Sequence, residues 1–143
     1  MAIRVYIDQG HNPVSPNTGA ERNGLTEQEI TYEVGRLLYE KLRANPNYEA
    51  RLSRPTPTTQ LGTSNAGSLR ARVQGAEDFG ADLFLSIHTN ASVNSSASGS
   101  EALVYRVDST AGRIGESLLR SMTRLTGLRN RGVIARPGLY VLR

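Results

Sequence analysis

The chain has 143 residues, of which 38% are hydrophobic and 21% are charged, and Lys and Arg outnumber Asp and Glu by 17 to 13. This composition excludes an intrinsically disordered chain, and the length allows one domain with a buried hydrophobic core. No apolar run approaches the roughly 20 residues that span a bilayer, and the lack of cysteine excludes disulfides and thiolate metal ligands.

Strand-like and helix-like segments alternate along the chain. Short apolar runs predict strands at Ile3–Asp8, Tyr48–Ser53, Leu83–His88, Ala102–Val107 and Leu139–Leu142. Apolar residues at helical spacing predict helices at Glu27–Ala44, Ser68–Phe79 and Thr110–Thr126. This alternation favours an α/β fold, with a mostly parallel twisted sheet and helices on both faces, in three αβα layers.

Two of the predicted helices carry further signals. Thr26 and Glu29 make a capping box at the start of the first helix. In the second helix Leu69, Val73 and Ala76 recur at helical spacing, so this side is expected to face inward.

Polar segments connect the predicted elements at His11–Leu25, Pro55–Gly67 and Ala91–Ser100. The last of these is rich in serine and low in complexity, but it is too short to separate two domains. The 143 residues are therefore expected to form a single domain.

Much of the positive charge gathers towards the end of the chain. The residues concerned are Arg113, Arg120, Arg124, Arg129, Arg131, Arg136 and Arg143. A solvated helix face and loop is the ordinary explanation of such a cluster, and attraction to a polyanion, such as nucleic acid or an anionic cell wall, is the alternative. Because no aromatic residues are interleaved with these arginines, a nucleic-acid groove is disfavoured.

The chain has only two histidines, His11 and His88, and each lies at the end of a predicted strand. In parallel sheets, ligands bind beyond the carboxyl ends of the strands. We therefore expect the two histidines to be neighbours in space, although they are far apart in sequence. A single histidine at a strand end is more often a structural residue, but two at one sheet edge favour a binding site.

Glu27 opens the first predicted helix and is a candidate third member of this set. Its ordinary explanation is the helix macrodipole, which favours acidic residues in the first turn. Two imidazoles and one carboxylate also form the open tetrahedral arrangement of catalytic zinc, in which the fourth position is left for water. Imidazole ligands favour zinc over magnesium or calcium.

Several motifs, spread from Ile3 to Arg143, resemble those of one enzyme family. They are IDQGH at the first predicted strand, NGLTEQEI around Glu27, ADLFLSIHTNA around His88, and the later GSEALVY, GLRNRGV and LYVLR. In these motifs the chain resembles the catalytic domain of zinc-dependent N-acetylmuramoyl-L-alanine amidases of type 3. No G-x-S-x-G elbow, P-loop or G-x-G-x-x-G turn occurs to suggest a serine hydrolase or a nucleotide-binding protein.

The resemblance implies particular roles for five residues. His11, Glu27 and His88 match the zinc ligands of the family, so one Zn²⁺ per chain is expected. Asp8 and Asn90 match family positions near the site, where they would order the loops, accept hydrogen bonds from the metal-bound imidazoles or contact substrate.

The sequence departs from the family pattern in two places. Asn12 and Pro13 replace the glycine that is common after the first histidine. The family's catalytic acid/base is a glutamate in a Val-Glu-x-Gly motif on a further strand, which would follow Arg143. The catalytic residue is therefore unknown within these residues, and the last strand and helix of the domain are expected to be missing. Glu101 is the remaining candidate, although an ordinary strand-edge acid is the favoured explanation of it.

The function implied by the resemblance is hydrolysis of the amide bond between N-acetylmuramic acid and L-alanine in peptidoglycan, for cell-wall lysis or remodelling. The alternative is a catalytically impaired module of the same fold that binds peptidoglycan or regulates a partner. Peptidoglycan is the expected partner, with no role for nucleic acid and no membrane segment. No leader occurs in these residues, so an exported domain of the cell wall or periplasm and a cytoplasmic protein of the phage endolysin type stay open as alternatives.

Overall fold

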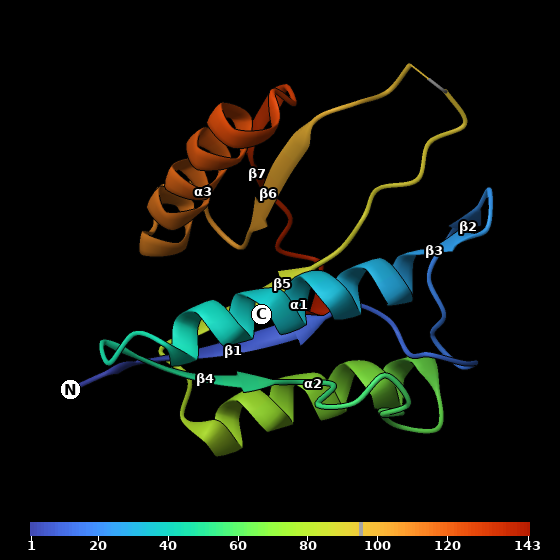
Figure 1. Ribbon diagram of the computed structural model, residues 1–143, viewed down its shortest axis with the longest axis vertical. Coiled ribbons are helices and arrows are strands. Elements are labelled where there is room, and N and C mark those ends of the chain that lie inside the picture. The colour runs from blue at the N-terminus through green and yellow to red at the C-terminus, as the bar shows by residue number, and fades with distance from the viewer. Residues whose placement is uncertain (95) are drawn as a thin grey trace. The chain divides into compact units, whose positions relative to one another are not determined.

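The computed structural model describes residues 1–94 and 96–143, and residue 95, within the predicted loop Ala91–Ser100, lies outside the described residues. The chain divides into two compact units, Met1–Ala91 and Ser92–Arg143 (Figure 1). The single domain predicted from the sequence stays a prediction.

A three-stranded parallel sheet forms the centre of the first unit. Its strands are β4 (Tyr48–Leu52), β1 (Ile3–Gln9) and β5 (Leu83–Ile87), in that order. Val5 of β1 lies opposite Ala50 of β4 and Leu83 of β5. The predicted strands are confirmed to within one residue at each end, and β1 and β5 are adjacent as the histidine argument required.

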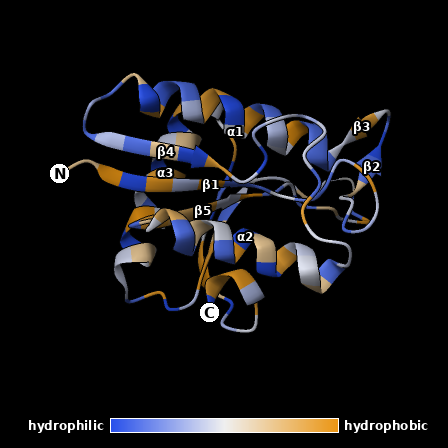
Figure 2. Ribbon diagram, turned by 90° about the horizontal axis from the view of Figure 1, so that it is seen from below, coloured by the Kyte–Doolittle hydropathy of each residue, from blue (hydrophilic) through white to orange (hydrophobic). Residues whose placement is uncertain are grey.

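Helices α1 (Glu27–Arg43) and α2 (Asn65–Phe79) cover opposite faces of this sheet, which Figure 2 shows between them. Successive residues of a strand point to opposite faces of the sheet, so every second side chain of β1 faces α1 and the others face α2. Gln9 donates from Nε2 to the carbonyl of Tyr32 on α1 at 3.2 Å. Tyr6 points the other way and packs against Ala76 and Phe79 of α2. Helices on both faces were predicted, and the first unit confirms them.

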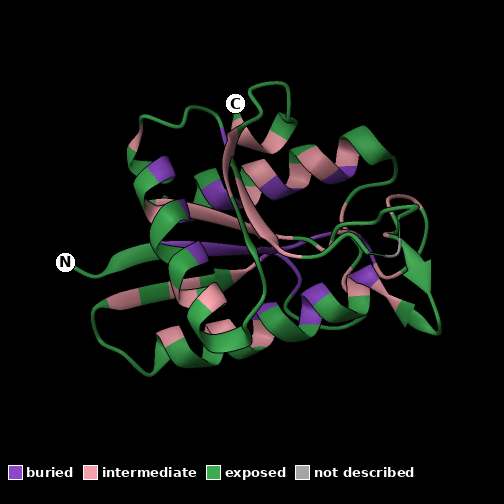
Figure 3. Ribbon diagram, turned by 90° about the horizontal axis from the view of Figure 1, so that it is seen from above, coloured by how far each residue is buried: buried purple, intermediate pink, exposed green. Residues whose placement is uncertain are grey.

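The buried core follows β1, and Figure 3 shows this run of buried residues along the central strand. Val5, Tyr6 and Ile7 are almost completely buried. Helix α1 approaches the strand closely at Gly35, where a Cβ atom would overlap Cγ of Gln9. Glycine at this position therefore sets the distance between helix and sheet.

Helix α2 begins three residues before the predicted Ser68. Ser64 is its N-cap, and its hydroxyl accepts a hydrogen bond from the Gly67 N–H at 3.0 Å. Gly80, in the left-handed conformation, ends the helix. The sequence prediction missed this start because Asn65–Gly67 carries no apolar residue at core spacing except one alanine.

Helix α1 begins at Glu27 as predicted, but its capping box is incomplete. The Thr26 hydroxyl donates to Oε2 of Glu29 at 2.7 Å and makes no bond to the helix backbone. The Glu27 N–H donates instead to the carbonyl of Ala20 at 2.9 Å. This bond joins the helix start to the loop that precedes it, in which β2 (Glu21–Arg22) and β3 (Leu25–Thr26) form a short antiparallel hairpin.

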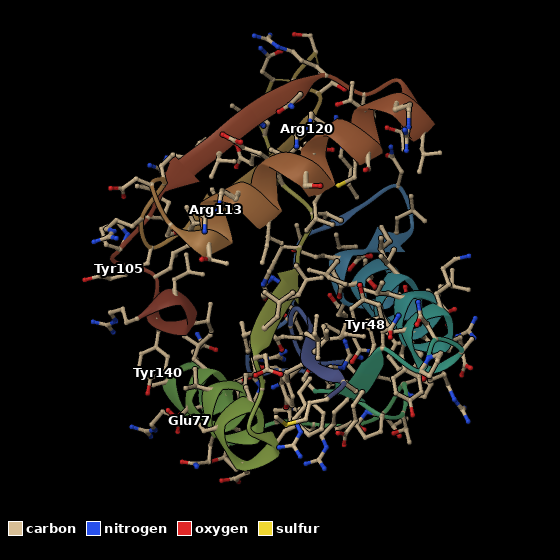
Figure 4. All side chains as sticks on the ribbon, turned by 90° about the vertical axis from the view of Figure 1, so that its left-hand side faces the viewer. Tyr48, Glu77, Tyr105, Arg113, Arg120 and Tyr140 are labelled. Carbon is tan, nitrogen blue, oxygen red and sulfur yellow. The ribbon has the colours of Figure 1, made fainter. Side chains whose placement is uncertain are left out.

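The second unit contains a parallel pair of strands, β6 (Ser100–Val104) and β7 (Asn130–Ala135), joined by α3 (Thr110–Thr126). Helix α3 packs on this pair, and a Cβ at Gly115 would lie 3.0 Å from Cβ of Ala102. Figure 4 labels Arg113 and Arg120 on α3, and both side chains are exposed, as a solvated helix face predicts.

None of the described helices is both long and apolar enough to cross a membrane.

The second unit differs from the sequence prediction in three places. Leu139–Leu142 is not a strand, because Tyr140–Leu142 form a short 3₁₀ helix after the Pro137–Gly138 turn, with the Leu142 N–H bonded to the Leu139 carbonyl at 3.1 Å. Strand β7 was not predicted at all. Its sequence NRGVIA has only three consecutive apolar residues and a glycine with φ of 90°, so it lacks a strand pattern. The predicted strand Ala102–Val107 also starts and ends too late, since β6 spans Ser100–Val104.

Replacement of Ile7 by alanine should strongly destabilise the first unit. Ile7 is fully buried in the central strand, so Ile7→Ala is expected to lower the free energy of unfolding by about 2–5 kcal/mol. Ile3→Ala, on the same strand but 48% exposed, is the matched control and should lower it by no more than about 1 kcal/mol. Urea denaturation measures both, and equal losses would contradict the placement of β1 at the centre of the core.

Candidate metal centre

Three segments of the first unit bring His11, Glu27 and His88 together. His11 follows β1, His88 directly follows β5, and Glu27 is the first residue of α1. The two strands run parallel and side by side, so their carboxyl ends meet at one edge. The imidazole centroids lie 4.9 Å apart, with the rings nearly perpendicular at 81°. The predicted proximity of the histidines is confirmed.

The carboxylate of Glu27 lies between the two imidazoles. Its Oε2 is 3.3 Å from Nε2 of His11, and its Oε1 is 3.1 Å from Nδ1 of His88. One donor atom from each of the three residues lies within 4.8 Å of the others. Ligands bound to one tetrahedral zinc ion at about 2.1 Å are separated by about 3.4 Å. The two distances from Glu27 to the histidines match this spacing, and two imidazoles and a carboxylate are ligand types that zinc takes, so the three residues could hold such an ion.

The backbone holds Glu27 in place. The Ala20 N–H donates to Oε2 at 3.2 Å and the Thr89 N–H donates to Oε1 at 2.9 Å. The residue is only 6% exposed. Burial is the largest single influence and raises the pKa of Glu27, but the two N–H donors and the neighbouring histidines together hold that pKa below its ordinary value. The group is therefore kept as an anion, the form that binds a metal.

His11 adopts an uncommon backbone conformation. Its φ is 68°, in the left-handed region, where histidine is more frequent than most non-glycine residues. Such a conformation costs about 1–3 kcal/mol and persists only where the surroundings impose it. Here the carbonyl of His11 accepts hydrogen bonds from Nη2 of Arg72 at 2.8 Å and from Nη1 of Arg54 at 3.3 Å.

Both of these arginines are buried, at about 1% exposure. Nη1 of Arg72 donates to Oδ1 of Asp8 at 2.6 Å, which makes a buried ion pair. The pKa of Arg54 is lowered, first by burial and next by the positive charge of Arg72. The turn that carries His11 is therefore hydrogen-bonded to two buried guanidinium groups, and one of these, that of Arg72, is held in turn by Asp8.

Three further residues were candidates for the site, and they differ in their contacts and exposure. The Asp8 carboxylate bonds to Arg72 and accepts from the Ser86 hydroxyl at 2.7 Å, whereas Nδ1 of His11 is buried and has no hydrogen-bond partner among the described residues. Asn90 lies two residues beyond His88 and is exposed. Glu101 belongs to the second unit, where its carboxylate lies 3.2 Å from Nη2 of Arg131. Roles for Asp8, Asn90 and Glu101 in function stay predictions.

Arg72 and Arg54 were not among the residues that the sequence predicted for the site. The buried face of α2 is formed by Ser68, Arg72, Ala76 and Phe79, while Leu69 and Val73, which were expected to face inward, are only partly buried. The position of Arg72 in the sequence could have indicated its burial. It lies three residues after Leu69 and four before Ala76, and this spacing places it near the inward side of the helix.

The fold and the site together define an α/β protein in which three residues that could hold a metal ion meet at the edge of a parallel sheet. A family profile described as N-acetylmuramoyl-L-alanine amidase matches residues 5–143. The chain belongs to this family, the type 3 amidases, as the sequence motifs predicted.

Relatives and solved structures agree with this assignment. The N-acetylmuramoyl-L-alanine amidase LytC of Bacillus subtilis (strain 168) is 34% identical over 131 residues, which cover 90% of this chain and 24% of LytC. The catalytic domain of the amidase CwlV from Bacillus (Paenibacillus) polymyxa var. colistinus has a TM-score of 0.79 at 28% identity, covering 99% of this chain and 73% of that one. An N-acetylmuramoyl-L-alanine amidase from Clostridium difficile 630 has a TM-score of 0.81 at 27% identity, with the same coverage. The chain thus spans about a quarter of the length of LytC.

Replacement of Gly10 should disturb the edge where the histidines meet. A Cβ at this position would lie 2.6 Å from the backbone oxygen of Ile87 and 2.6 Å from Cε1 of His88, and the Ile87 oxygen also accepts the Gly10 N–H at 3.0 Å. Gly10→Ala is therefore expected to lower the free energy of unfolding of the metal-free protein by about 1–3 kcal/mol.

The control for this prediction is Gly138→Ala, because no atom lies within 4 Å of a Cβ built at Gly138. Urea denaturation should give the control an unfolding midpoint equal to that of the wild type. A Gly10→Ala midpoint equal to the wild type would contradict the close approach of β1 to His88.

Proposed function

We propose that this chain is the catalytic domain of an N-acetylmuramoyl-L-alanine amidase that binds one zinc ion through His11, Glu27 and His88. Its proposed reaction is hydrolysis of the amide bond between N-acetylmuramic acid and L-alanine in peptidoglycan. The observation that carries the proposal is the convergence of one donor atom from each of these residues within 4.8 Å, in a chain whose family is named for this activity.

Zinc, when bound, supplies a Lewis acid that polarises the amide carbonyl and lowers the pKa of water. The chain supplies the charge and the shape of the site. Glu27 stays anionic because two backbone N–H groups donate to its carboxylate. His88 has a side chain that is 47% exposed, so the site is open to solvent on the side of this ring. A substrate as large as a peptidoglycan strand needs such an open approach.

Hydrolysis of an amide also requires a group that moves a proton to the leaving nitrogen. The Val-Glu-x-Gly motif of the family does not occur in the printed sequence. Glu101 is engaged with Arg131 at 3.2 Å, which favours a structural role for its carboxylate. We therefore propose that the proton-transfer glutamate lies outside these 143 residues. The substrate lies in the cell wall, and we propose that the protein acts there, after export or at lysis.

Zinc binding should depend on Glu27 and not on its neighbour Glu29. Both residues lie in the first turn of α1, but only Glu27 contacts the histidines, whereas Glu29 bonds to Thr26. The wild-type chain is expected to bind one zinc ion. Glu27→Ala should weaken binding by more than the roughly 10–100-fold that follows loss of an outer hydrogen-bond partner, and Glu29→Ala should leave it unchanged.

Metal content after dialysis and competition with a chromogenic chelator measure these affinities. Absence of zinc from the wild-type chain would contradict the proposed metal centre. An equal loss in both variants would show that the helix start, and not the Glu27 carboxylate, is responsible.

Amidase activity is best tested on the full-length product of the gene that encodes this chain. With purified peptidoglycan it should release peptides that begin with a free L-alanine amino group, detected by mass spectrometry. Chelation of zinc and Glu27→Ala should each abolish release. The 143-residue chain alone should be slower by about 10²–10⁴-fold, the usual contribution of a positioned acid–base group.

Equal activity of the two forms would show that the proton-transfer group lies within the 143 residues, and Glu101→Gln would then identify or exclude the remaining candidate. Binding of peptidoglycan by the full-length protein without peptide release would favour the alternative function, a binding or regulatory module.

A further inference from the structure

The guanidinium of Arg72 makes five hydrogen bonds, one for each of its N–H donors. Nη1 donates to Oδ1 of Asp8 at 2.6 Å and to the carbonyl of Gln9 at 2.7 Å. Nη2 donates to the carbonyl of His11 at 2.8 Å and to Oδ1 of Asn12 at 3.3 Å. Nε donates to the hydroxyl of Ser68 at 3.4 Å. Four of these acceptors belong to one short segment, from the end of β1 to the residue after His11.

Arg72 makes more hydrogen bonds than neutralisation of its buried charge requires. Asp8 alone would neutralise Arg72, and Ser86 already holds the second oxygen of that carboxylate at 2.7 Å. The other acceptors on the segment are backbone carbonyls and one amide side chain, so the guanidinium also determines the path of the backbone. It bonds to the carbonyl of the one residue there that has a positive φ, His11.

Arg54 donates to the same carbonyl. Its Nη1 donates to the carbonyl of His11 at 3.3 Å and to that of Gln28 at 3.0 Å. Gln28 directly follows Glu27, so one guanidinium nitrogen joins the turn of His11 to the helix start that carries the carboxylate. The Arg54 N–H also donates to Oε1 of Gln9 at 2.9 Å, which ties this arginine to β1.

We propose that Arg72, assisted by Arg54, is a positioning residue of the metal centre. By holding the carbonyl of His11 it keeps that residue in the left-handed conformation from which Nε2 faces Glu27. The inference rests on the proposed function, since it requires zinc to bind at His11, Glu27 and His88. Without these bonds His11 relaxes towards negative φ and its imidazole turns away. Zinc then binds only the fraction of molecules in the competent conformation, and the apparent affinity falls in proportion.

The test compares zinc affinity with folding stability. Arg72→Lys keeps the positive charge opposite Asp8, but one ammonium cannot span carbonyls and carboxylate as the planar guanidinium does. We expect Arg72→Lys to weaken zinc binding by about 10–100-fold, as loss of an outer hydrogen-bond partner does elsewhere. The visible absorption of the cobalt(II)-substituted protein should also change, because the imidazole of His11 is displaced.

Phe79→Leu is the matched control. Phe79 is another buried residue of α2, and it packs on Tyr6 away from the histidines. This variant should lower the thermal midpoint of the metal-free protein but leave zinc affinity and the cobalt spectrum unchanged, because well below that midpoint almost all molecules are folded. A residue that only stabilises the fold would behave as Phe79 does.

Each outcome decides the inference. Wild-type protein that binds no zinc would overturn the proposed function, and this inference with it. Wild-type protein that binds zinc, with Arg72→Lys binding equally well, would overturn the positioning role alone. If Arg72→Lys does not fold, Arg54→Lys decides, because it removes the longer bond to the same carbonyl and keeps the Asp8–Arg72 pair. Weaker zinc binding by Arg54→Lys is expected, and unchanged binding would overturn the inference.

Discussion

The parallel pairing of β1 with β5 is the constraint on which the site depends. It places the carboxyl ends of two strands side by side, although their residues are far apart in the chain. The Gly10 N–H continues this pairing beyond β1 by donating to the Ile87 carbonyl at 3.0 Å. Only glycine allows that approach, because any side chain there would meet the carbonyl and the ring of His88. Both histidines therefore emerge from a single rigid edge.

The carboxylate between the histidines reflects a balance of opposing effects. Burial of an anion is unfavourable, and it raises the pKa of Glu27. The N–H groups of Ala20 and Thr89 offset this, because each donates to one carboxylate oxygen. These donors come from the loop before α1 and from the residue after His88. The folded backbone therefore selects the charge state of Glu27.

Behind the site, the core is polar where a small protein would ordinarily be apolar. Asp8, Gln9, Asn12, Arg54 and Arg72 are all buried. Such a network is weak evidence of stability, since desolvation of charges offsets much of their attraction. The network instead determines the path of the backbone, because its hydrogen bonds fix particular backbone atoms. Asn12, which departs from the family pattern, illustrates this by bonding to the carbonyls of Pro16 and Leu61 and so joining two loops.

The sequence by itself determined the alternation of strands and helices, the family and the three residues that are candidates to bind a metal. Apolar periodicity and short motifs are local patterns, and β1, β4, β5 and α1 followed them closely. Strand β7 did not, because NRGVIA has no local strand pattern and forms a strand by pairing with β6. The final LYVLR was mistaken for a strand because hydrogen bonds within a turn, not its apolar residues, set its shape.

Only the tertiary structure decided how the side chains of these candidate residues are oriented. The left-handed backbone of His11 and the inward direction of Arg72 depend on contacts between residues about sixty positions apart. No local pattern encodes such contacts, since an arginine on a helix is ordinarily solvated. The residue types that bind a metal can thus be read from short segments, whereas their orientation is a property of the packed sheet and helices.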